Sequence, residues 1–250
     1  TLSSQYALDE KEDYKRVLNN GIKTVMALCI PSTMILMVLN REIMQILFKW
    51  GYMSEYEAAM NGLALLAYTP ALLFQSVVVI LNRAFYSIQN TRIPLLVGLG
   101  TIGVSIFANI YFANCTEFGA IGTAMAYVIT VMINAFLLIV LFERKTGMEL
   151  IRDNFTFLVK TAAVTVISGI TLWLCSMVIP FPADENFSIG NKILEILSVS
   201  ARVIPALLVF AVVSVWLRID EIRKIMASLI LQARKLVVRR TAGKLKAKNI

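Results

Sequence analysis

Residues 118–142 read FGAIGTAMAYVITVMINAFLLIVLF and contain no Asp, Glu, Lys or Arg. A helix needs about 20 mostly apolar residues to cross the hydrocarbon core of a bilayer. Five further stretches have this character, although one of them is only just long enough and another carries a single charge. They are 24–40, 59–81, 95–113, 161–183 and 196–217, the last with Arg202. The sequence therefore predicts an all-α polytopic membrane protein with six transmembrane helices.

The composition agrees with this class and argues against an enzyme. Hydrophobic residues make up 58% of the 250 positions and charged residues 16%, below the roughly 25% that is usual in soluble domains. There is no histidine, and the three cysteines follow no metal or redox spacing. The chain also lacks a phosphate-binding glycine loop and any pair of carboxylates within the spans. We therefore expect no catalytic site, no metal and no cofactor.

The positive charge is distributed unevenly between the two sides of the predicted spans. Of 24 Lys and Arg residues, 20 fall on one side, three fall on the other, and Arg202 lies within a span. Because cytoplasmic segments are enriched in Lys and Arg, both ends of this chain are predicted to be cytoplasmic. The net charge of +8 is thus a topology signal, and nucleic-acid binding is not needed to explain it.

Local signals refine this plan. The apolar residues Ile43, Ile46, Leu47 and Trp50 predict a short helix lying along the membrane interface between the first two spans. Ser54 and Glu57 form a capping box ahead of the second span, which contains Pro70. Small residues are expected to allow close helix packing in the third and fourth spans; they are Gly98, Gly100, Gly103, Gly119 and Gly122.

The chain divides into four segments by hydropathy and charge. The longest predicted inner loop, near residue 150, separates the first four spans from the last two, and a basic amphipathic stretch follows the sixth. The expected divisions are a cytoplasmic amphipathic segment at 1–23, a four-helix part at 24–145, the last two transmembrane helices at 146–218 and a cytoplasmic basic amphipathic tail at 219–250.

Arg202 is the sharpest single residue, because a charge inside a membrane span is costly. It lies about 24 Å along the helix from the inner end, near the outer headgroups. One interpretation is that its side chain reaches up to those headgroups. The other is that it binds an anionic phosphate group, for which the guanidinium is well suited.

Several short motifs occur in a fixed order over roughly the first 145 residues. They are Phe48 with Gly51, Leu66-Ala67-Tyr68, Arg83-Ala84-Phe85-Tyr86, the turn Asn90-Thr91-Arg92-Ile93-Pro94, and then Gly119, Gly122 and Asn134. In these motifs the chain resembles the lipid II flippase family, called MurJ or MviN. Asn90 and Ile93 replace the Asp and Thr of the family's turn, and beyond residue 145 only the hydropathy and the basic tail agree.

The resemblance implies that the chain is the C-terminal part of a 14-helix MOP/MATE-like transporter and supplies helices nine to fourteen. It implies alternating-access movement of the undecaprenyl-pyrophosphate-linked peptidoglycan precursor, lipid II, from the inner to the outer leaflet of the plasma membrane. The last two helices would form a groove for the lipid tail. The implied partners are this precursor, membrane phospholipids and the cell-wall synthesis machinery.

The resemblance also implies site residues. Arg202 matches an arginine of the family's final helix, which favours a contact with the lipid phosphate. Ser105, Asn109 and Thr123 fall near a cation site of some members, while Tyr127 stands where a small hydroxyl residue is expected. The main headgroup arginines of the family belong to earlier helices.

Two other functions fit the same features. One is export of a different lipid-linked unit, for capsule, teichoic acid or O-antigen, by a member of the same superfamily. The other is a non-transporting membrane scaffold that recruits soluble partners through the basic tail at 219–250.

Overall fold

The computed structural model describes residues 11–48, 54–115, 119–182, 189–217, 219, 221–223 and 227. Eight labelled helices account for nearly all of this described part. They are α2 (Lys11–Val38), α3 (Asn40–Phe48), α4 (Glu55–Tyr68), α5 (Ala71–Ser87), α6 (Arg92–Cys115), α7 (Ala120–Thr146), α8 (Leu150–Val178) and α9 (Ile189–Trp216).

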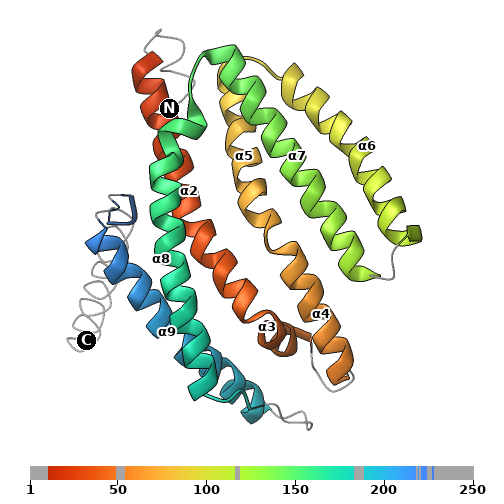
Figure 1. Ribbon diagram of the computed structural model, residues 1–250, viewed down its shortest axis with the longest axis vertical. Coiled ribbons are helices and arrows are strands. Elements are labelled where there is room, and N and C mark those ends of the chain that lie inside the picture. The colour runs from red at the N-terminus through yellow and green to blue at the C-terminus, as the bar shows by residue number, and fades with distance from the viewer. Residues whose placement is uncertain are drawn as a thin grey trace, which may run out of the picture.

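The helices form two neighbouring groups with α2 between them (Figure 1). On one side α8 packs against α2 and carries α9. On the other side α5 packs against α2 and α7, and α6 lies outermost against α7. The short helix α3, the start of α4 and the start of α9 gather at one end, which we call the α3 end. The starts of α2, α6 and α8 lie at the opposite end.

The number of spans agrees with the prediction of six. Five described helices are long and apolar enough to cross a membrane, and α4 with α5 forms a sixth, broken span. The two halves of that span are bent by 41° at Thr69 and Pro70. Proline has no N–H to continue the helical ladder, which explains a bend at this position. Pro31, in contrast, lies within α2, which runs unbroken across the boundary expected at residue 23.

The main apolar core lies between α2, α5 and α7. Phe85 and Phe142 meet edge to face with 5.2 Å between ring centroids, and both are fully buried. Tyr14 is also buried there and donates a hydrogen bond from its hydroxyl to the carbonyl of Ala84 at 3.2 Å. Lipid is as apolar as these side chains, so close packing and such bonds, rather than escape from water, hold the helices together.

Close helix crossings do not occur at four of the glycines expected to provide them, Gly98, Gly100, Gly103 and Gly119. A Cβ added at Gly98, Gly100 or Gly103 would meet nothing within 4 Å, so these residues of α6 are not packing sites. On Gly62 of α4, however, a Cβ would lie 3.1 Å from the Cα of Arg41 in α3. The glycine pattern pointed to the wrong span because spacing along one helix does not reveal where its neighbour crosses.

Other local predictions have mixed outcomes. The capping box of Ser54 and Glu57 is confirmed at the start of α4. A short helix between the first two spans is confirmed as α3, but it buries Gln45 and leaves Leu47 exposed. Trp50 and Gly51 lie outside the described residues, as does most of the tail; Ile219 and Ile222 are buried against the cluster that contains Phe157 and Phe210.

Candidate functional site

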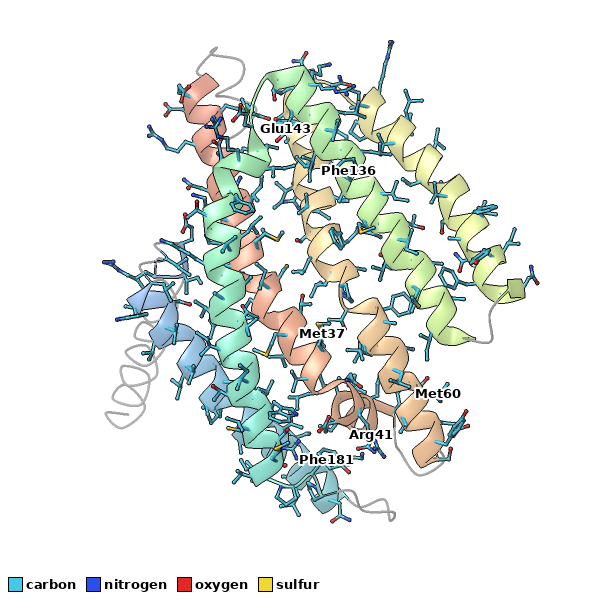
Figure 2. All side chains as sticks on the ribbon, viewed as in Figure 1. Met37, Arg41, Met60, Phe136, Glu143 and Phe181 are labelled. Atoms are coloured by element: carbon cyan, nitrogen blue, oxygen red, sulfur yellow. The ribbon has the colours of Figure 1, made fainter. Side chains whose placement is uncertain are left out.

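The only charge within the predicted spans is deeply buried at the α3 end. The Arg202 side chain, on α9, is 2% exposed, and its Nη1 donates to Oε1 of Glu42 at 3.0 Å. The guanidinium also lies over the ring of Phe181, 5.8 Å from its centroid. Arg41 of α3 and Phe181 both appear at this end in Figure 2. Arg202 therefore contacts a carboxylate of α3 and an aromatic ring of the segment that follows α8.

Glu42 was missed by the sequence analysis, although it is the direct partner of Arg202. The two residues are 160 positions apart, and Glu42 lies in a segment that was interpreted as an interfacial helix. The only sequence signal at Glu42 was its charge beside an otherwise apolar helix face. Because a charge in hydrocarbon needs a partner, a search for carboxylates near the same membrane depth would have found it.

A second ion pair lies within α9, and its cation also contacts α3. Lys192 of α9 lies 2.7 Å from Oε2 of Glu195, and the side chains are 12% and 4% exposed. The same ammonium donates to the backbone carbonyl of Gln45 in α3 at 3.1 Å. Together with Arg202 and Glu42, these residues form a buried cluster of two cations and two carboxylates, which we call the α3–α9 charge cluster.

The α3–α9 charge cluster retains unused donor capacity. A guanidinium has five N–H donors, and Nε of Arg202 is buried with no hydrogen-bond partner among the described residues. An unsatisfied buried donor costs about 1–3 kcal/mol. An anionic oxygen that reached Arg202 could therefore accept a hydrogen bond from this buried, unpaired Nε–H.

The three candidate cation ligands are only partly brought together. Asn109 donates from Nδ2 to the carbonyl of Ser105 at 2.8 Å and lies 3.4 Å from its hydroxyl, which is ordinary spacing for one turn of α6. Thr123 is exposed on α7. Tyr127 packs against Tyr68 of α4, with ring centroids 5.6 Å apart. The described residues contain no cluster of three His, Cys, Asp or Glu side chains that could hold a metal.

Polar contacts also join α2 to α8 at the opposite end of the bundle. Lys15 lies 2.7 Å from Oδ2 of Asp153, and Asn154 donates to Oδ1 of Asn19 at 2.9 Å. Next to Asn154 a small apolar cavity of about 90 Å³ lies between α2, α5, α7 and α8. The cavity is too small for a sugar headgroup.

The fold and the buried charges define a polytopic α-helical membrane protein whose interior holds paired polar groups. The family model described as lipid II flippase MurJ matches residues 1–187. This chain belongs to that family.

Individual relatives give the same result over part of their length. A probable lipid II flippase MurJ of Buchnera aphidicola subsp. Schizaphis graminum is 28% identical over 199 residues, 80% of this chain and 38% of the relative. The Vibrio cholerae protein of the same description is 28% identical over 69% of this chain and 33% of its own length. The chain thus spans well under half of these relatives.

A solved structure supports the fold. The structure described as lipid II flippase MurJ, inward closed conformation, matches with a TM-score of 0.65 and 23% identity, over 87% of this chain and 42% of the other. The expected fold class, an α-helical part of a MurJ-type transporter, is confirmed.

Removing the partner of Arg202 should destabilise the protein. We expect Glu42→Ala to lower the free energy of unfolding by about 2 kcal/mol, somewhat less than for a fully buried pair because Glu42 remains 20% exposed. The control Glu149→Ala breaks an ion pair whose two side chains are 62% and 83% exposed, and it should change stability little. Unfolding in detergent, followed by circular dichroism, measures both; equal stability of the two variants would contradict the expectation.

Proposed function

We propose that this chain contributes to the movement of lipid II, the undecaprenyl-pyrophosphate-linked peptidoglycan precursor, from the inner to the outer leaflet of the plasma membrane. The observation that carries the proposal is the family match over residues 1–187. The six-span helical fold supports it, because a lipid-linked headgroup needs a helical scaffold to cross hydrocarbon. The lipid is moved without chemical change, so the protein is not an enzyme, and the cell-wall synthesis machinery is its expected partner.

Transporters that work by alternating access commonly contain discontinuous helices within the membrane. The 41° bend between α4 and α5 supplies such a discontinuity, and it separates a half buried in the main core from a half beside α3. The last two helices, α8 and α9, expose many apolar side chains, as a surface for a lipid tail would; examples are Ile170, Trp173 and Leu208.

Complementation tests this function directly. The complete gene that encodes this chain should restore growth to a bacterium depleted of its own lipid II flippase, with lipid II appearing in the outer leaflet. Failure despite good membrane expression would contradict it. Transport of capsule, teichoic acid or O-antigen precursors in the same assay would identify another exporter. Loss of partner binding on deletion of 219–250, without any transport, would identify a scaffold.

We propose that the opposite end of the bundle faces the cytoplasm and the α3 end faces outward. The excess of Lys and Arg in the segments at the opposite end supports this orientation. In a protein without native cysteines, Tyr56→Cys at the α3 end should react with a membrane-impermeant maleimide in intact cells. Arg152→Cys should react only after permeabilisation. Both native side chains are exposed, so the reverse labelling pattern would refute the orientation.

We further propose that Arg202 contacts the lipid phosphate during transport. Its unpartnered Nε supports this role, and Glu42 would share the guanidinium with the phosphate. We expect Arg202→Ala to weaken transport without loss of protein from the membrane, and Arg202→Lys to retain part of it because the charge remains without the bidentate fork. Equal transport by wild type and Arg202→Ala at equal expression would contradict a phosphate contact of Arg202. Arg152→Ala, at an exposed position, is the control.

We propose a cation site with fewer ligands than the family's site. Ser105 and Asn109 on α6 and Thr123 on α7 remain the candidate ligands, and Tyr127 occupies the expected hydroxyl position. Sodium dependence of transport that disappears in Asn109→Ala, but not in Thr101→Ala elsewhere on α6, would support this site. Transport with the same sodium dependence in both variants would exclude it.

A further inference from the structure

The short helix α3 contacts three helices at once: α2, α4 and α9. It is nine residues long and lies at the end of the bundle where the last helix begins. A short element of this kind is usually a simple connection between spans. The contacts of α3 with these three helices hold it more rigidly than a simple connection needs.

The contact with α9 has two separate points. Arg202 donates to the Glu42 carboxylate at 3.0 Å, and Lys192 donates to the Gln45 carbonyl at 3.1 Å. Lys192 and Arg202 are ten residues apart, which is about 15 Å along α9. One ion pair would allow α3 to pivot on α9. On α3 the two contacted residues, Glu42 and Gln45, are three positions apart, about 4.5 Å along the helix, so the second contact restrains rotation of α3 on α9.

The contact with α4 is made through backbone. A Cβ on Gly62 would lie 3.1 Å from the Cα and 3.3 Å from the N of Arg41, and 3.0 Å from Oδ1 of Asn40. The Asn40 side chain lies at this crossing, and the backbone of Arg41 approaches Gly62 almost as closely. A displacement of α3 toward α4 is therefore passed on through the Arg41 backbone, which cannot move aside by a change of rotamer.

The junction with α2 is also stiff. Leu39 lies between α2 and α3 and is fully buried. Its N–H donates to the carbonyl of Ile35 at 3.0 Å, and its own carbonyl accepts from Ile43 at 2.9 Å. The backbone ladder thus continues through the change of direction, and α3 behaves as an extension of α2 rather than as a loop.

The half-span α4 is the neighbour best placed to move. It ends at Tyr68, directly before the bend at Thr69 and Pro70. Beyond the bend, α5 contributes Val78, Leu81, Ala84 and Phe85 to the main core, whereas α4 contributes none of the residues buried there. A rotation about the bend would leave that core intact and would shift α4 along α7, where Tyr68 packs on Tyr127.

We propose that α3 couples α9 to α4, so that a shift of α9 turns the half-span α4 about the bend at Thr69–Pro70. Glu42, Lys192 and Gly62 are the positioning residues of this coupling, and none of them needs to touch the lipid. The role of this coupling in transport rests on the proposed function. The coupled movement of α9 and α4 itself does not depend on which lipid is moved.

The test measures the distance between α4 and α9 in the complete protein, reconstituted in bilayers. Spin labels are placed at Tyr56→Cys and Ile193→Cys in a background without native cysteines, because both side chains are exposed, at 72% and 60%. The variants are Glu42→Gln, Gly62→Ala and the exchange of charges in Glu42→Arg with Arg202→Glu. Gly100→Ala is the matched control, because its added Cβ meets nothing within 4 Å.

We expect Glu42→Gln and Gly62→Ala each to broaden the distance distribution or add a second distance, and to lower the transport turnover by about fivefold or more. In Gly62→Ala the apparent affinity for lipid II should stay within about twofold, since Gly62 has no part in the proposed phosphate contact. The Gly100→Ala control should match wild type. Restoration of the single distance by the charge exchange would show that the pairing, rather than either residue alone, carries the effect.

Unchanged distance distributions in both Glu42→Gln and Gly62→Ala would overturn the coupling. So would a change in Glu42→Gln alone, because the path through α4 would then be absent. The distance measurement requires no substrate, so a protein that fails to move lipid II but shows the expected distances would refute the proposed function and leave the coupling standing. If the charge exchange fails to fold, Gly62→Ala still decides the question.

Discussion

Inside hydrocarbon, apolar surfaces give two helices no reason to prefer each other over lipid, and this constraint governs every contact in the structure. Two kinds of interaction can still hold helices together. One is close packing of complementary surfaces, and the other is the pairing of polar groups that cannot face lipid. The core of α2, α5 and α7 uses the first, with Phe85 set edge to face on Phe142. The contact of α9 with α3 uses the second, through Arg202 and Glu42.

These two kinds of contact are separated along the bundle. The described residues of the main core are held by apolar packing without ion pairs, while α8 and α9 combine apolar clusters around Val164 and Leu172 with polar pairs near the ends of the molecule, Lys15 with Asp153 and Arg202 with Glu42. Between these fastenings α8 does bury hydroxyl groups, but Thr165 and Ser168 donate to carbonyls of their own helix. Among the described residues, the middle of α8 is therefore held by apolar packing rather than by hydrogen bonds to other helices.

The sequence predicted the number of spans, the helix between the first two spans and the capping box of Ser54, because each depends on residues close together in the chain. It misplaced the close helix crossings. Gly98 and its neighbours form a clear pattern, yet Gly62 makes the crossing, since the position of α3 decides it. Arg202 was recognised as unusual from its surroundings in the span. Its partner, Glu42, was not, because 160 residues separate them and only the fold joins them.

The α3–α9 charge cluster has a further consequence for energetics. Arg202 is matched by Glu42, and Lys192 by Glu195, so the cluster carries no net charge while both pairs are intact. The membrane potential does work of about 2.3 kcal/mol for each elementary charge moved through 100 mV. A shift that keeps both pairs intact carries the equal and opposite charges of these four residues through the field, so that Arg41 is the one charge of α3 and α9 left over. The membrane potential therefore does work on these four residues only when one of the two ion pairs separates.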